Sequence, residues 1–172
     1  AGIPVQIDKK TGDVILSFKD EYFDTNKAHL KPKMRNQLHK FFPLYSKSLL
    51  SDPKTAKMIA SVEIVGFASP TYKGRYIDPK SLDARDQKAV DYNMQLSFKR
   101  ANSIFKYIFD TKKMRYNYQR NMRPMVKVTG RSFLAEGIQG RSIASGLSNR
   151  QYCRKFNCKK SQKVIIRFNL KD

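Results

Sequence analysis

The chain has 172 residues, a length that predicts one domain. Apolar residues make up 40% of it, and with 11 Phe and 9 Tyr they are enough for one hydrophobic core. It carries 35 Lys and Arg against 14 Asp and Glu, and its net charge of +21 excludes basic partners and favours polyanions. No apolar run is long enough to span a bilayer, and the opening Ala1-Gly2-Ile3-Pro4 lacks the charged start and apolar core of a signal peptide.

The positive charge is concentrated in the second half of the sequence. Residues 91–172 carry 19 basic and 4 acidic side chains. Nucleic acid, anionic lipid and an acidic cell-wall polymer all fit such a surface, and so does a basic surface with no partner. Nucleic acid is not favoured, because no RNA-recognition, KH or zinc-finger signature is present.

The first half predicts a polar extension or linker over residues 1–13, a strand over 14–18 and then a long helix. The helix should begin near Lys31, because Pro32 suits a first helical turn. Pro43 should kink or end it. Apolar residues at steps of three and four form a stripe that indicates a core-facing side: Leu30, Met34, Leu38, Phe41, Tyr45 and Leu49.

The later elements alternate between strands and helices. A short apolar strand over 62–66 should be central, and a long polar connection over 67–90 is typical of a functional or mobile segment. A helix from between Ser81 and Asp91 to Phe109 follows, then a basic loop over 111–124, a strand over 125–130, a long segment over 131–161 and a strand over 164–170. This order favours βαβ crossovers and a mixed sheet with helices on one face.

Three polar residues of the second helix are spaced so that a helix places them on one face. Asn93, Ser97 and Arg100 follow one another at steps of four and three. An apolar side should build the core: Leu96, Ala101, Ile104, Phe105 and Ile108. A guanidinium offers a planar fork of donors that matches a carboxylate or phosphate, so the polar face is interpreted as an anion-recognition site.

The two cysteines, Cys153 and Cys158, fit a local disulfide, two free thiols or, least well, part of a zinc site. A disulfide would indicate an oxidising compartment such as a periplasm. The sequence contains no nucleophile triad pattern, no phosphate-binding glycine loop and too few metal ligands for a metal centre. It therefore predicts a binding module without catalytic residues, metal or cofactor.

Several short motifs, in order, resemble the OmpA-like C-terminal domain, a peptidoglycan-binding module of outer-membrane anchors, Pal lipoproteins and MotB-type proteins. Tyr92-Asn93 with Leu96-Ser97 and Arg100-Ala101 matches the pattern Asn-x-x-Leu-Ser-x-x-Arg-Ala. Weaker matches are Phe23-Asp24 with Leu30-Lys31-Pro32, residues 64–69, residues 128–132 and residues 161–164. The resemblance implies an α+β fold of order βαβαββ, with a mixed four-stranded sheet and helices packed on one face. It also implies one domain over 14–172 with long insertions at about 67–90 and 131–161.

The resemblance also implies a binding site for the peptidoglycan stem peptide. In that family an aspartate and an arginine bind the diaminopimelate residue of this peptide. Here Arg100 and Asn93 are kept and Ser97 lies between them, but Ser69 stands at the aspartate position and Phe67 at the histidine position. An acid from the following connection could replace the missing charge, the candidates being Asp78, Asp83, Asp86 and Asp91.

The function implied is a non-catalytic module that anchors an envelope protein or complex to peptidoglycan. It would be periplasmic, in the cell envelope and associated with the outer membrane, with membrane contact only through a segment not present in this chain. The alternative is an OmpA-like structural subunit of a secretion or motility complex that has lost peptidoglycan binding, with other envelope subunits as partners.

Overall fold

The computed structural model describes residues 6–7, 13–17, 23–24, 26–134, 150–151, 154 and 162–172, with the main chain alone for 6, 7, 16 and 17. Its main sheet has the order β1-β2-β7-β3-β6, formed by β1 (Gln6–Ile7), β2 (Val14–Ser17), β7 (Lys163–Leu170), β3 (Ile59–Gly66) and β6 (Val126–Gly130). Only the β3–β6 pair is parallel; β3–β7, β2–β7 and β1–β2 are antiparallel. The four expected strands are all present, and the two-residue β1, from within the expected extension, adds a fifth at one edge.

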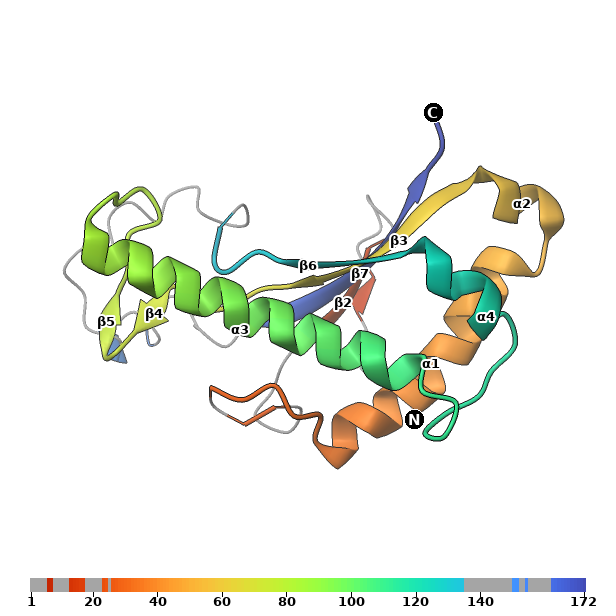
Figure 1. Cartoon of the computed structure of the whole chain (residues 1–172), viewed down its shortest axis with the longest axis horizontal. Coiled ribbons are helices and arrows are strands. Elements are labelled where there is room, and N and C mark those ends of the chain that lie inside the picture. Colours follow the sequence, from red (N-terminus) through yellow and green to blue (C-terminus); the bar gives the residue numbers. More distant parts are fainter. Residues whose placement is uncertain are drawn as a thin grey trace.

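Two long helices pack on one face of this sheet, as the sequence predicts (Figure 1). They are α1 (Pro32–Leu50) and α3 (Ala84–Ile108), and they give the α+β order βαβαββ. On the helix-covered face Ile64 of β3 lies opposite Ile166 of β7, and both are fully buried. The next pair, Val65 and Ile165, points to the other face and is equally buried. The alternation of a strand thus gives the two faces separate apolar clusters.

The helix α1 does not end at Pro43, which corrects the alternative that it would stop there. It continues to Leu50 with Pro43 inside it. A proline inside a helix costs about 3 kcal/mol. Here, however, large side chains are buried on both sides of it, among them Met34, Leu38, Phe42 and Leu49. Burial of such side chains contributes about 1.5–3 kcal/mol each, which outweighs the proline.

The connection over 67–90 contains a hairpin that the sequence did not predict. Its strands are β4 (Thr71–Tyr72) and β5 (Arg75–Tyr76), joined at Lys73 and Gly74. Both turn residues have positive φ, 45° and 80°, which is the pattern of a type I′ turn. The hairpin buries Tyr76 and the following Ile77 at the start of α3.

Three short helices complete the described structure. The helix α2 (Pro53–Met58) links α1 to β3, and Asp52 caps it by accepting the N–H of Thr55 at 2.9 Å. The segment expected to be a basic loop over 111–124 instead contains α4 (Gln119–Met122) and the start of a 3-10 turn, η1 (Arg123–Met125). The fully buried Met122 ties this segment to the core beside α1.

Candidate binding site

The helix α3 carries the predicted site residues, but it turns them inward. Asn93, Ser97 and Arg100 are 4%, 0% and 4% exposed. Their steps of four and three continue to Ala101, Ile104 and Ile108, which are buried on the same helix. The polar and apolar residues therefore form one stripe facing the protein interior, and the expectation of a separate outward polar face is wrong.

Asn93 and Ser97 use their side chains to join α3 to neighbouring segments. The Ser97 hydroxyl donates to the carbonyl of Met94 at 2.9 Å and accepts the main-chain N–H of Ser132 at 3.0 Å, after β6. The Asn93 amide donates to the carbonyl of Ala89 at 3.1 Å, with a longer contact of 3.5 Å to the carbonyl of Thr71 in β4. These bonds satisfy buried polar groups and fix loops on α3.

Arg100 lies beneath the segment that leads into α1. Its Nε donates to the carbonyl of Lys27 at 3.0 Å, and one terminal nitrogen donates to the carbonyl of Asp24 at 3.3 Å. The guanidinium also stands over the ring of Phe23, 5.3 Å from its centroid. Burial lowers the pKa of Arg100, because a charge removed from water is disfavoured. The guanidinium is therefore not at the mouth of an open cleft, as the sequence had led us to expect.

Ser69 and Phe67 follow β3 and are also buried, but they go to different places. The Ser69 hydroxyl lies 2.9 Å from that of Thr71 and accepts a bond of 3.3 Å from the amide of Gln162. Because Thr71 also meets Asn93, Ser69 and Asn93 belong to one polar cluster. Phe67 instead packs with Val65 in the apolar cluster on the sheet face opposite α1 and α3. Phe67 is thus a packing residue separate from the Arg100 environment.

The acids of the 67–91 region do not replace the missing aspartate within the described part of the chain. Asp86 pairs with Arg75 at 2.6 Å, and Asp83 caps α3 by accepting the N–H of Arg85 at 2.8 Å. None of the contacts of the four candidates reaches Arg100: Asp78, Asp83, Asp86 and Asp91. The carboxylate partner that the resemblance implies is therefore not supplied by this connection.

Two glycines that no sequence motif had indicated hold α3 close to the sheet. A Cβ added at Gly66 of β3 would clash with the main-chain carbonyl of Ser97, and one at Gly130 of β6 would lie 2.7 Å from the main-chain nitrogen of Phe98. Each glycine is the last residue of its strand, and this position at a strand end is the sequence signal that could have indicated the close contact with α3. The absence of a Cβ lets the helix lie directly on the strand ends.

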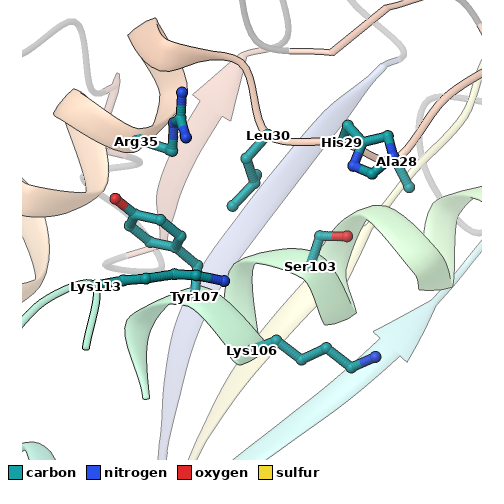
Figure 2. A pocket seen from close by; sticks show the side chains of 8 residues that line it. All are labelled: Ala28, His29, Leu30, Arg35, Ser103, Lys106, Tyr107 and Lys113. Carbon is teal, nitrogen blue, oxygen red and sulfur yellow. The ribbon is translucent and has the colours of Figure 1, made fainter. Parts of the chain in front are cut away.

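A groove lies between the segment before α1 and the second half of α3, and its lining does not include Arg100. Figure 2 shows Ala28, His29 and Leu30 on one side and Ser103, Lys106 and Tyr107 on the other. A second hollow continues it along Lys99 and Asn102, and each hollow has a volume of about 260 Å³. No sequence motif pointed to this groove.

Cys153 and Cys158 lie outside the described residues, and the disulfide stays a prediction. Among the residues that the structure describes, no group of three His, Cys, Asp or Glu side chains could hold a metal ion. In that same part of the chain, no helix has the length and apolar character needed to cross a membrane.

Neither protein-family models nor curated proteins match this sequence. Among solved structures, the periplasmic domain of Helicobacter pylori MotB (residues 90–256) is similar, with a TM-score of 0.50 and 13% identity over 98% of this chain and 79% of that chain. The chain shares the fold of that periplasmic domain. This likeness confirms the α+β architecture that the sequence resemblance implied, and at such low identity it concerns the fold alone.

Two further solved structures align with the chain at lower scores. The cell wall anchor of the T6SS from Pseudomonas aeruginosa has a TM-score of 0.49 and 15% identity, with 97% of this chain and 88% of that chain covered. The OmpA-like domain of FopA1 from Francisella tularensis has a TM-score of 0.47 and 17% identity, with 98% and 82% covered.

Proposed function

We propose that this protein is a non-catalytic module of the cell envelope that anchors an envelope protein or complex to peptidoglycan. The observation that carries the proposal is the position of Arg100 within an OmpA-like fold. It lies in the matched Asn-x-x-Leu-Ser-x-x-Arg-Ala segment and donates to the main-chain carbonyls of Lys27 and Asp24, just before α1. In the proposed mechanism the anionic group is a carboxylate of the peptidoglycan stem peptide.

Binding would exchange the loop carbonyls for that carboxylate. Arg100 now donates to two neutral main-chain oxygens, those of Lys27 and Asp24. A carboxylate can accept two parallel bonds from a guanidinium, and charge-assisted bonds are about twice as strong as neutral ones. It would also offset the desolvation that lowers the pKa of Arg100. Asp24 and Lys27 would therefore have to move aside when the ligand enters.

Binding to purified sacculi tests the proposal. We expect the wild-type protein to co-sediment with sacculi at moderate salt and to be released by free diaminopimelate. Arg100→Ala should abolish the fraction of bound protein that free diaminopimelate releases. Arg100→Lys should reduce this fraction, because lysine keeps the charge but lacks the planar fork of donors. Arg123→Ala is the matched control, since Arg123 is exposed in η1 and away from α3.

Far-ultraviolet circular dichroism must show that each variant is folded, because Arg100 also holds the 24–27 loop. Retention that is equal for wild type, Arg100→Ala and Arg100→Lys would remove Arg100 from the mechanism. Retention that responds to salt but not to diaminopimelate would reduce the interaction to adsorption of a basic protein on an acidic polymer.

A second candidate is a structural subunit of an envelope complex that has lost peptidoglycan binding. The observation that favours it is that Asn93, Ser97 and Arg100 are all engaged in bonds within the fold, while Ser69 replaces the acid. A wild-type protein that does not bind sacculi but co-purifies with other envelope proteins would support this candidate instead.

A further inference from the structure

The groove between the segment before α1 and the second half of α3 combines a hollow with concentrated positive charge. Its walls carry two basic side chains of α3, Lys99 and Lys106, together with Arg35 of α1 and Lys113 after α3. Among the residues that the structure describes, no Asp or Glu lines either hollow. Walls that carry several basic side chains raise the local concentration of anions.

Three of these cations have no acidic partner within the described residues. The ion pairs of the structure use other basic groups, and none includes Arg35, Lys99 or Lys106. Lys113 pairs with Asp110 at 3.4 Å, but that pair is exposed at the far end of the groove. Uncompensated like charges repel one another, so an anion bound among them would relieve that repulsion.

Neutral polar side chains lie between the charges. The Tyr107 hydroxyl lies 3.0 Å from Nε2 of His39, which fixes the ring at the Arg35 end of the groove. Ser103 lies near the middle of the groove, and its hydroxyl donates to the main-chain carbonyl of Lys99 at 2.9 Å (Figure 2). At the other end are Lys99, Lys106 and the amide of Asn102. The groove therefore has two basic ends connected by hydroxyl groups.

We propose that this groove binds a ligand with two linked phosphate groups, one at the Lys99–Lys106 end and one at the Arg35 end. A guanidinium and ammonium groups are the side chains that hold phosphate most strongly. A single carboxylate would leave most of the charge uncompensated. The hollow of about 260 Å³ at each end has room for a compact group of this kind. The inference does not rest on the proposed wall binding, because Arg100 does not line the groove.

Calorimetric titration of the whole chain with inorganic pyrophosphate and, separately, inorganic phosphate, at equal ionic strength, tests the inference. Pyrophosphate should bind at least about tenfold more tightly than phosphate, because only pyrophosphate can meet both basic ends. The double variant Lys99→Glu/Lys106→Glu should weaken pyrophosphate binding at least about tenfold, since it replaces the two cations of one end of the groove with two carboxylates that repel phosphate.

The matched control is Lys54→Glu/Lys57→Glu on α2, which makes the same change in net charge at exposed positions away from the groove. Its effect on pyrophosphate affinity should stay below about threefold. Equal weakening in both double variants, equal affinity for phosphate and pyrophosphate, or no detectable binding would each overturn the inference.

Vesicles distinguish the source of the phosphates. Phosphatidylcholine vesicles are compared with vesicles that also contain cardiolipin, whose headgroup carries two phosphates. Cardiolipin-dependent binding that Lys99→Glu/Lys106→Glu removes would identify a lipid headgroup, whereas pyrophosphate binding alone would indicate a soluble ligand. Binding of single-stranded oligonucleotide without binding of pyrophosphate would assign the surface to nucleic acid and contradict the inference.

Discussion

Ser97 shows how a side chain that resembles a ligand contact can instead belong to the interior. Its hydroxyl is fully buried and bridges its own helix to the N–H of Ser132. A buried N–H without an acceptor has lost its hydrogen bond to water and gained none in the protein, so it costs the full free energy of desolvation. The hydroxyl therefore fixes the chain just after β6 relative to α3.

Ser97→Ala should lower the free energy of unfolding by about 1–3 kcal/mol, because the N–H of Ser132 would remain buried without an acceptor. Urea denaturation measures the change. Ser103→Ala is the matched control on the same helix: its hydroxyl also donates to a helix carbonyl, at 2.9 Å, but is exposed. The control should change stability by less than about 0.5 kcal/mol. A similar effect of both substitutions would show that the bond to Ser132 contributes nothing particular.

The sequence predicted that three polar residues share one face of α3, but not the surroundings of that face. The spacing of Asn93, Ser97 and Arg100 correctly placed them together on a helix. Their burial could not be predicted, because Arg100 is covered through the main-chain carbonyls of Lys27 and Asp24. Every residue has such a carbonyl, so no residue type at those positions signals the contact.

The contact between α3 and the sheet depends on two strand ends that carry no side chain. Gly66→Ala should lower the free energy of unfolding by about 3 kcal/mol, the upper part of the usual range for overpacking, because the new methyl would meet main-chain atoms of Ser97 that cannot rotate away. Thermal and urea unfolding provide the measurement.

Gly74 supplies the comparison for this prediction. It has a positive φ of 80° in the β4–β5 turn, with no heavy atom within 4 Å of an added Cβ. Asparagine tolerates this conformation, so Gly74→Asn should cost less than about 1 kcal/mol. If Gly66→Ala were as mild as Gly74→Asn, the close approach of α3 to β3 would not be a requirement of the fold.

The long strands and helices were predicted from the periodicity of apolar residues. The features that were not predicted have identifiable physical causes. Strands expected over 14–18, 62–66, 125–130 and 164–170 correspond to β2, β3, β6 and β7, with differences of a few residues at their ends. The β4–β5 hairpin has strands of two residues, too short to show alternation. The survival of α1 through Pro43 reflects burial in the core, which a local rule about proline does not include.

The net charge of +21 acts on the stability of the folded chain as well as on its partners. Compaction brings like charges together, and salt screens their repulsion. Raising sodium chloride from about 0.01 M to about 1 M shortens the Debye length from about 30 Å to about 3 Å. We expect the melting temperature to rise by about 2–4 °C, equivalent to about 1 kcal/mol for a chain of this size.

Differential scanning fluorimetry at several salt concentrations checks this expectation. Lys54→Glu/Lys57→Glu, with a smaller net charge, should show a smaller rise. A melting temperature that falls with salt would mean that the few ion pairs, such as Arg75–Asp86, outweigh the general repulsion.

The position of β7 within the sheet has a consequence for how the protein is made. This strand, residues 163–170, lies between β2 and β3 and joins them, so the two meet only through it. During synthesis the ribosome releases β2, β3 and both long helices before it releases β7. Until then, β3 can pair with β6 but lacks its antiparallel neighbour, and its apolar edge remains open to other chains. The nascent protein is therefore most exposed to aggregation in the interval just before translation of this stretch is complete.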